Sequence, residues 1–207
     1  MILNKAEFLV VNNPLRDFIQ EKYEIPILRK MIPADVQFET ALEIGCGTGQ
    51  GSGLIKKYFA PVKIEAIDLD DRMIGLAQKR NHDHAINYSQ MDAAKLEFPD
   101  DHFDIIFDFA IIHHIPNWQD CIHELARTAK DGAFLLLEEL SIESFSGIPG
   151  GLWKKILDHP YEKMFDFQEL EDFLEATGFQ ILQTKYSNPL GLLKHISLAA
   201  KLKKTGV

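Results

Sequence analysis

Short apolar stretches alternate with amphipathic ones over residues 40–140, and this alternation restricts the possible folds more than any other feature of the chain. The apolar stretches predict strands at residues 40–45, 62–68, 85–91, 103–110 and 133–140. The amphipathic stretches predict helices at residues 50–59, 71–80 and 118–129. Strands separated by helices in this way predict βαβ units, and therefore a parallel sheet with helices on both faces.

Helical patterns also flank this region. Residues 14–32 predict helix on both sides of Pro26, which should break the helix or end its first piece. The apolar face expected for this segment consists of Leu15, Phe18, Ile19 and Tyr23. Asp131-Gly132 is expected to form a turn before the strand that follows it.

The regular alternation of apolar and amphipathic stretches ends near residue 140. Asp166 and Glu169 have the spacing of a capping box, and Gly178 stands where a helix over residues 166–177 would end. The other expected elements are a short helix near residues 152–157 and strands at residues 179–186 and 194–202. Because a short loop joins these last two strands, we expect them to pair antiparallel.

A glycine-rich turn follows the first predicted strand, where Gly45, Gly47 and Gly49 come after Glu43. Glycines let the backbone turn sharply and approach a ligand closely, and ligands bind at the carboxyl edge of an open parallel sheet. Asp68 ends the next predicted strand, 19 residues beyond Gly49, where a carboxylate can accept both hydroxyls of a ribose. The alternatives are a plain strand-to-helix turn and a helix-capping Asp68, but Asp70 is the better cap.

The spacing of the glycines does not fit a nicotinamide dinucleotide. The dinucleotide fingerprint is Gly-x-Gly-x-x-Gly/Ala, and no glycine of this turn is followed five positions later by Gly or Ala. The turn can instead hold a ligand with an amino-acid end. A nicotinamide-dependent oxidoreductase is therefore the less favoured enzyme.

Further motifs follow in order, and together they resemble the class I S-adenosylmethionine-dependent methyltransferases. Residues 43–49 resemble motif I of this class, and residues 66–70 (AIDLD) resemble the second motif. Residues 91–93 (MDA) and 103–107 (FDIIF) resemble the third motif and the fourth strand.

Two more stretches resemble the small-molecule subfamily called type 11, which includes quinone-biosynthesis-like members. Residues 112–118 (IHHIPNW) resemble its "hHHhpd-W" element, and residues 124–133 resemble its E-x-x-R-x-L-K-P-G-G run. Asp131 and Ala133 replace the usual Pro and second Gly of that run. The resemblance covers roughly residues 38–140.

The resemblance implies a Rossmann-like α/β fold: a mostly parallel seven-stranded sheet, with the last strand antiparallel and helices on both faces. It also implies a single methyltransferase domain over residues 1–207. Its expected parts are an N-terminal helical cap (1–37), a cofactor-binding core (38–140), and an acceptor-side insertion with a C-terminal helix and antiparallel strands (141–207).

The activity that the resemblance implies is methyl transfer from S-adenosyl-L-methionine to a small-molecule acceptor by in-line displacement, leaving S-adenosyl-L-homocysteine. Asp68 would then bind the ribose, and Asp92 would meet the adenine amino group. The full implied cofactor-binding set is Glu43, Gly45, Cys46, Gly47, Gly49, Asp68, Leu69, Met73, Asp92, Ala93, Asp108 and Phe109. A catalytically inactive, cofactor-binding interaction subunit is the alternative function.

No catalytic residue is established by the sequence. His113 and His114 are candidates because imidazole titrates near neutral pH, although they can equally shape the loop. A sulfonium methyl is already electrophilic, so aligning a good nucleophile and excluding water can suffice. Aromatic residues near the expected acceptor side, which either cover the acceptor or simply pack, are Tyr23, Trp153, His159 and Tyr161.

The amino-acid composition limits the classes of molecule that the protein is expected to bind. Lys and Arg number 22 against 31 Asp and Glu, and a net charge of −9 argues against a nucleic-acid binder. Two cysteines make no disulfide framework, and no apolar run reaches the ~20 residues of a membrane span, so a cytoplasmic protein is expected. His82 and His84 are expected in a solvated loop, with no metal site. The sequence leaves the oligomeric state open.

Overall fold

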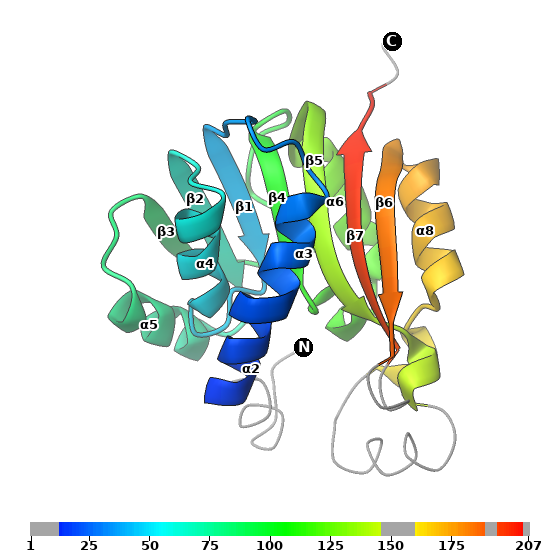
Figure 1. Ribbon diagram of the computed structural model, residues 1–207, viewed down its shortest axis with the longest axis horizontal. Coiled ribbons are helices and arrows are strands. Elements are labelled where there is room, and N and C mark those ends of the chain that lie inside the picture. Colours follow the sequence, from blue (N-terminus) through cyan, green and yellow to red (C-terminus); the bar gives the residue numbers. More distant parts are fainter. Residues whose placement is uncertain (1–12, 146–159, 189–193, 205–207) are drawn as a thin grey trace.

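The computed structural model describes residues 13–145, 160–188 and 194–204. Its centre is a seven-stranded sheet with the order β3-β2-β1-β4-β5-β7-β6 (Figure 1). The strands are β1 (Thr40–Ile44), β2 (Lys63–Asp68), β3 (Ile86–Gln90), β4 (Phe103–Phe109), β5 (Ala129–Leu140), β6 (Phe179–Ser187) and β7 (His195–Leu202). β7 runs antiparallel to β5 and β6, while the other neighbouring pairs are parallel. The expected fold class is confirmed.

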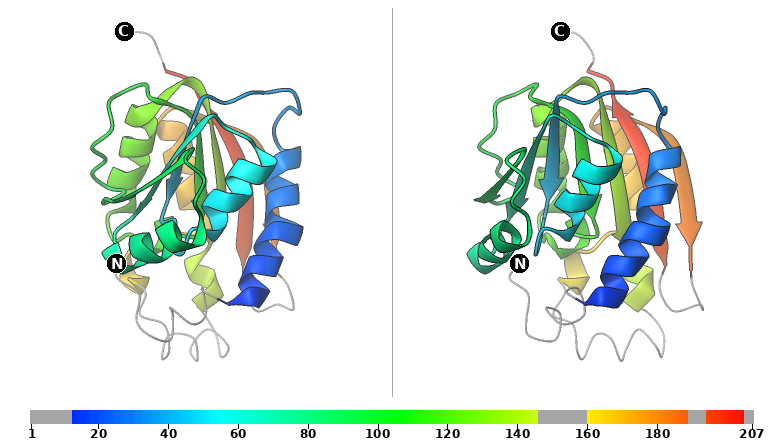
Figure 2. Two further views of the ribbon diagram at one scale, coloured as in Figure 1. Left: turned by 90° about the vertical axis from the view of Figure 1, so that its left-hand side faces the viewer. Right: turned by 60° about the vertical axis from the view of Figure 1, so that its left-hand side comes forward.

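Helices cover both faces of this sheet. They are α2 (Pro14–Ile19), α3 (Ile25–Lys30), α4 (Gln50–Tyr58), α5 (Asp71–Arg80), α6 (Trp118–Thr128) and α8 (Phe167–Ala176), with a π-helical turn η1 (Gln20–Glu24) and short 3₁₀ turns η2 (Ile112–His114), η3 (Ile142–Phe145) and η4 (Tyr161–Lys163). The core residues of α3, α4 and α5 belong to one apolar cluster and those of α6 and α8 to another. Figure 2 shows the sheet between these two helix layers.

The alternation of side chains along the strands explains these two cores. Successive strand residues point to opposite faces of a sheet, so Leu42 and Ile44 join the α6–α8 core while Ala41 joins the other. All three are fully buried. Because both faces of the sheet are covered, the strands read as nearly continuous apolar runs in the sequence.

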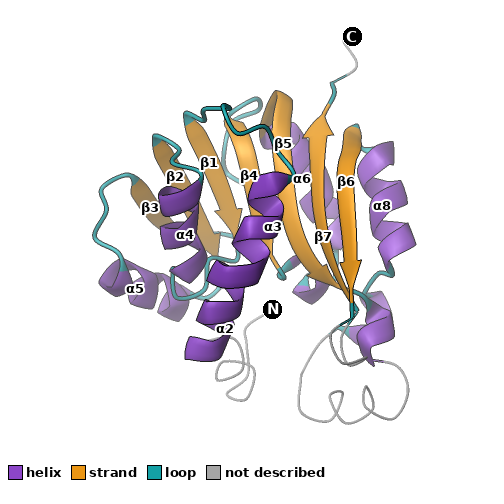
Figure 3. Ribbon diagram, in the orientation of Figure 1, coloured by secondary structure: helices purple, strands orange, loops and turns teal. Residues whose placement is uncertain are grey.

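The N-terminal segment departs from expectation in two ways. It forms one helical run from Pro14 to Lys30 rather than two pieces (Figure 3). The π turn η1 ends at Glu24, two residues before Pro26. In η1 the Ile25 N–H donates to the Gln20 carbonyl, five residues back, and this wider turn accommodates the proline that would otherwise break the helix.

The apolar face predicted for this segment was also wrong. Leu15, Phe18, Ile19 and Tyr23 are exposed, with 66%, 52%, 38% and 59% of their surface accessible. A π turn holds more residues than an α turn, so it rotates the side chains before it relative to those after it. The preceding turns therefore point their apolar side chains outward. The buried face is Gln20, Glu24, Ile25 and Leu28.

The fifth strand begins earlier than predicted. β5 starts at Ala129, so Asp131 and Gly132 lie inside it rather than in a turn. Gly132 has a φ of +78°, and the register between β4 and β5 shifts between Phe103 and Ile105. The predicted turn residues therefore produce an irregularity within the strand. No helix among the described residues is long and apolar enough to cross a bilayer.

The predicted capping box of α8 is present. Asp166 Oδ1 accepts the Glu169 N–H at 2.9 Å, and Glu169 Oε2 accepts the Asp166 N–H at 3.1 Å. We expect Asp166→Ala to lower the free energy of unfolding by about 1 kcal/mol, since it leaves helix N–H groups without this acceptor. Urea unfolding measures the change. Glu175→Ala, at the exposed far end of α8, is the control and should leave stability nearly unchanged.

Candidate cofactor site

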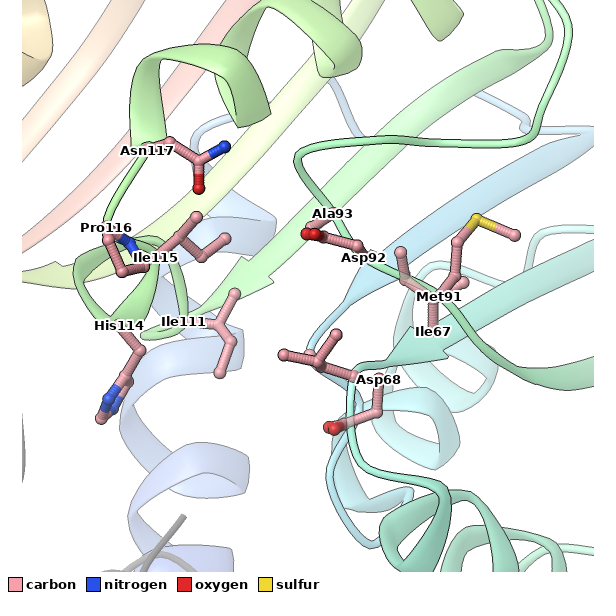
Figure 4. A pocket seen from close by; sticks show the side chains of 12 residues that line it. Ile67, Asp68, Met91, Asp92, Ala93, Ile111, His114, Ile115, Pro116 and Asn117 are labelled. Atoms are coloured by element: carbon pink, nitrogen blue, oxygen red, sulfur yellow. The ribbon is translucent and has the colours of Figure 1, made fainter. Parts of the chain in front are cut away.

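A pocket lies at the carboxyl edge of the sheet, between two walls that face each other in Figure 4. Gly45, directly after β1, contributes to its lining. One wall follows the ends of β2 and β3 and consists of Ile67, Asp68, Leu69, Met91, Asp92 and Ala93. The opposite wall follows β4 and consists of Ile111, His114, Ile115, Pro116 and Asn117. The parallel strands therefore bring four segments, one from the end of each of β1, β2, β3 and β4, to one site.

The glycine turn is shaped by its contact with the second wall. Gly45 has a φ of +63°, and a methyl group on its Cα would lie 2.2 Å from Ile111 Cγ1. Gly47 has a φ of +52°, but a methyl group there would meet nothing within 4 Å. The turn is thus closed against Ile111 at Gly45 and open at Gly47. That open backbone is a place where a ligand can approach closely.

Asp68 joins the glycine turn to the end of β2. Its Oδ2 accepts the Gly47 N–H and its Oδ1 accepts the Asp70 N–H, both at 2.9 Å. Burial raises the pKa of this carboxyl, and the two backbone N–H groups oppose that shift. Asp70, as predicted, is the residue that caps α5, accepting the Arg72 N–H at 3.0 Å. Since each carboxylate oxygen can accept about two hydrogen bonds, Asp68 keeps acceptor capacity for ligand hydroxyls.

Asp92 stands on the same wall, beyond β3. Its carboxylate is exposed, and Oδ1 accepts the Ala94 N–H at 2.9 Å, which fixes the direction of the side chain. Ile67, Met91 and Ala93 surround it with apolar surface. An acceptor at the rim of an apolar slot suits a flat heterocycle that carries an amino group.

Five residues of the predicted cofactor set line this pocket, namely Gly45, Asp68, Leu69, Asp92 and Ala93. The other seven lie outside its lining: Glu43, Cys46, Gly47, Gly49, Met73, Asp108 and Phe109. Met73 and Cys46 are buried in or beside the core, and burial raises the pKa of the Cys46 thiol. Gly47 still acts on the site through its hydrogen bond to Asp68.

Glu43 does not line the pocket; its side chain contacts α4, the helix that follows the glycine turn. It is 2% exposed and accepts a hydrogen bond from Ser52 Oγ in α4. Burial raises its pKa to about 8. A neutral carboxyl at this position ties β1 to the helix that follows the glycine turn.

The pH dependence of stability tests this arrangement. Native Glu43 keeps its proton up to a pH of about 8, whereas the unfolded chain loses it near 4.5, so ionisation of Glu43 makes the free energy of unfolding fall as pH rises between these values. We expect Glu43→Gln, which still accepts from Ser52, to remove that part of the slope. Urea unfolding at several pH values measures it; an unchanged slope would show that Glu43 is ionised in the native protein.

Sequence reasoning missed six lining residues: Ile67, Met91, Ile111, Ile115, Pro116 and Asn117. Ile67 and Met91 lie within the second and third motifs, Ile115, Pro116 and Asn117 lie within the family element at residues 112–118, and Ile111 directly precedes that element. Apolar residues in such places are indistinguishable from core residues until the facing wall is known. Among the described residues no group of three or more His, Cys, Asp or Glu is placed to hold a metal ion.

The two candidate histidines occupy different places. His114 lines the pocket, whereas the His113 ring contacts Glu139, with 2.6 Å between Nδ1 and Oε2. The two rings pack together with centroids 4.2 Å apart. Tyr161 packs edge-on against Phe145, while Trp153, His159 and the helix expected near residues 152–157 lie outside the described residues.

Comparison with known proteins identifies a methyltransferase domain in the chain. The model of a family described as "Methyltransferase domain" matches residues 42–137. A fatty-acid O-methyltransferase of Mycolicibacterium smegmatis is 31% identical over 103 residues, which is 50% of this chain and 38% of that protein. A malonyl-[acyl-carrier protein] O-methyltransferase of a Marinomonas species is 28% identical over 172 residues, 81% of this chain and 62% of that protein. The chain thus spans less than two thirds of the length of either relative.

A solved structure extends the likeness beyond the matched core. Phosphoethanolamine N-methyltransferase 2 of Haemonchus contortus, in complex with S-adenosyl-L-methionine, superposes with a TM-score of 0.75 at 17% identity. The match covers 98% of this chain and 61% of that one, and it shows a shared fold. Residues 42–137 therefore match a methyltransferase domain, and the described chain shares the Rossmann-like fold of a solved methyltransferase.

Proposed function

We propose that the protein binds S-adenosyl-L-methionine in this pocket and transfers its methyl group to a small-molecule acceptor. The observation that carries the proposal is Asp68, whose carboxylate ends β2, lines the pocket and is fixed by the Gly47 N–H at 2.9 Å. The proposal is supported by the position of this carboxylate beside a backbone that is open at Gly47, where it could accept from ligand hydroxyls. The arrangement fits a nucleoside linked to an amino acid.

The residues around the pocket divide the work of binding. Asp68 accepts from the ribose hydroxyls, and Asp92 accepts from the adenine amino group. Ile67, Leu69 and Ile111 supply apolar surface for the base. Gly45, Gly47 and Gly49 form the turn on which the amino-acid end would rest, and Glu43 holds that turn to α4 through Ser52.

The protein's part in the chemistry is mainly positional. When bound, the sulfonium of the cofactor supplies an electrophilic methyl group. The walls of the pocket then need to align the acceptor and keep out water, which can lower the barrier by several kcal/mol. Where the acceptor must lose a proton, His114 is the better placed of the two histidines, since it reaches the pocket lining while His113 is committed to Glu139.

The nature of the acceptor is drawn from the relatives. One relative is named for fatty acids and the other for a malonyl group carried on a protein, so an acyl carboxylate is the first acceptor class to test. The net charge of −9 disfavours nucleic acid as the acceptor. A small-molecule carboxylate, alcohol or amine is therefore the proposed range, with carboxylates foremost.

Titration calorimetry with S-adenosyl-L-methionine and S-adenosyl-L-homocysteine tests the first half of the proposal. We expect dissociation constants in the micromolar range, about −8 kcal/mol, and no binding of NAD under the same conditions. Methyl transfer is then measured by formation of S-adenosyl-L-homocysteine with a fatty acid, a malonyl thioester, an alcohol and a primary amine. Absence of cofactor binding would refute the proposal. Binding without turnover of any acceptor class would favour the alternative of an inactive interaction subunit.

A further inference from the structure

The wall of the pocket that follows β4 begins with a strained reversal. Ala110 has a φ of +65°, a conformation that non-glycine residues rarely adopt. The chain then enters the 3₁₀ turn η2, whose later amides are paired within the turn, from His114 N to the Ile111 carbonyl and from Ile115 N to that of Ile112. The first amides of such a turn need acceptors from elsewhere.

Two buried carboxyls provide these acceptors. Asp108 Oδ1, at the end of β4, accepts the Ile111 N–H at 3.0 Å. Glu139 Oε1, on β5, accepts the His113 N–H at 3.2 Å, and its Oε2 lies 2.6 Å from His113 Nδ1. The Leu140 N–H also donates to Glu139, at 3.0 Å. Both acidic side chains are fully buried.

The two carboxyls lie on the same face of neighbouring strands. β4 pairs with β5 in parallel, with Asp108 opposite Leu137, and Glu139 follows two residues later on the same face. Within the described part of the chain the buried Asp108 Oδ2 has no hydrogen-bond partner, and each of the two carboxyls shifts the pKa of the other. Two buried carboxylates side by side repel unless a proton lies between them.

We propose that Asp108 and Glu139 are positioning residues that act as a carboxyl pair sharing one proton and hold the η2 turn, with Ile111 and His114, against the glycine turn. The pair is the clamp that keeps Ala110 in its strained conformation and Ile111 in contact with Gly45. Loss of the proton would place two negative charges side by side and loosen this wall. The effect on cofactor affinity rests on the proposed function, but the clamp itself does not.

The surroundings keep the proton in place. Burial raises the pKa of Asp108 well above its usual range, and the Glu139 carboxyl adds to that shift; burial also raises the pKa of Glu139, to about 7. The other titratable groups near the pair are Cys121 of α6, His113 of η2, Glu43 of β1 and Glu138 of β5. No cation among them is paired with Asp108 in the described residues, so the proton has no replacement.

Three variants separate the clamp from a merely structural role. Asp108→Asn keeps both contacts, because its amide N–H donates to Glu139 and its oxygen accepts from Ile111, but it cannot lose a proton. Asp108→Ala removes the acceptor of the Ile111 N–H and the carboxyl that shares the proposed proton with Glu139. Glu139→Gln replaces one carboxylate oxygen with an NH₂ group. One of the two backbone N–H groups, of His113 or of Leu140, then faces a donor instead of an acceptor. At neutral pH we expect affinity for S-adenosyl-L-homocysteine within about two-fold of wild type for Asp108→Asn and at least about ten-fold weaker for Asp108→Ala and Glu139→Gln.

The pH profile is the second readout. Native Asp108 keeps a proton that the unfolded chain loses near 3.8, so wild type should lose stability relative to Asp108→Asn as pH rises from about 4 towards the raised pKa. Thermal unfolding of the two ligand-free proteins between about pH 5 and about pH 9 measures this difference. Because Glu43 and Glu138 titrate in both proteins, the comparison cancels their contributions.

Amide hydrogen exchange gives a readout that needs no cofactor. In Asp108→Ala the amides of Ile111 and His113 should exchange at least about ten-fold faster than in wild type, while amides of β1 keep their protection. Equal exchange in the two proteins, or the same pH slope in wild type and Asp108→Asn, would overturn the clamp. Failure of wild type to bind S-adenosyl-L-homocysteine would refute the proposed function alone, since exchange and unfolding would still report on the clamp.

Discussion

Gly45→Ala is expected to abolish cofactor binding and to lower the free energy of unfolding by about 2–5 kcal/mol. The new methyl group would lie 2.2 Å from Ile111 Cγ1 and 2.8 Å from its Cβ, well inside the sum of the van der Waals radii, so the η2 turn that carries Ile111 would have to move. The φ of +63° adds the penalty of a left-handed conformation for an L-residue. Urea unfolding and titration calorimetry measure the two losses.

Two other glycines make this experiment specific. Gly47 has a similar φ of +52°, but a methyl group there would meet no atom within 4 Å. Gly47→Ala should therefore lower the free energy of unfolding only by the strain energy, about 1–2 kcal/mol. Its methyl group would occupy the open side of the turn and weaken cofactor binding. Gly75→Ala lies in α5 with no close neighbour and no positive φ, and it should stabilise the protein by about 0.5–1 kcal/mol. If Gly45→Ala were no more damaging than Gly47→Ala, the close contact with Ile111 would not be a feature of the protein in solution.

Asp68→Ala is expected to weaken binding of S-adenosyl-L-methionine by at least about ten-fold, or about 1.4 kcal/mol. The substitution removes the proposed acceptor for the ribose hydroxyls and leaves the Gly47 and Asp70 N–H groups without their carboxylate. Titration calorimetry with wild type and variant gives the difference directly. Asp68→Asn keeps one acceptor oxygen and should lie between the two.

Asp70→Ala is the matched control for Asp68→Ala. Asp70 lies two residues from Asp68 and caps α5. It also forms an ion pair with the exposed Arg72 side chain, and it does not line the pocket. Its loss should cost about 1 kcal/mol of stability through the missing cap, with affinity within about three-fold of wild type. If both variants weakened binding equally, the effect of Asp68 would be on the shape of the loop rather than on the ribose.

Local patterns in the sequence were sufficient wherever a structure depends on near neighbours along the chain. The alternation of apolar and amphipathic stretches predicted the strands and helices of the sheet, and the caps at Asp70 and Asp166 were both confirmed. Hydrogen bonds that join residues two or three positions apart leave such a trace because their geometry is set by the intervening backbone. The ordered motifs likewise lie within residues 42–137, the stretch that matches the model of a methyltransferase domain.

Which side chains face each other across different elements was decided only by the tertiary structure. The sequence alone does not relate Asp108 to Glu139, and only the pairing of β4 with β5 puts the two carboxyls on the same face of neighbouring strands. Glu43 was expected at the ligand and instead contacts Ser52, because its face of β1 is covered by α4. In the N-terminal segment a single π turn rotated the apolar face away from the sheet. Periodicity fixes the spacing of side chains within one element, whereas burial and contact depend on which other element lies opposite, and that is a property of the assembled fold.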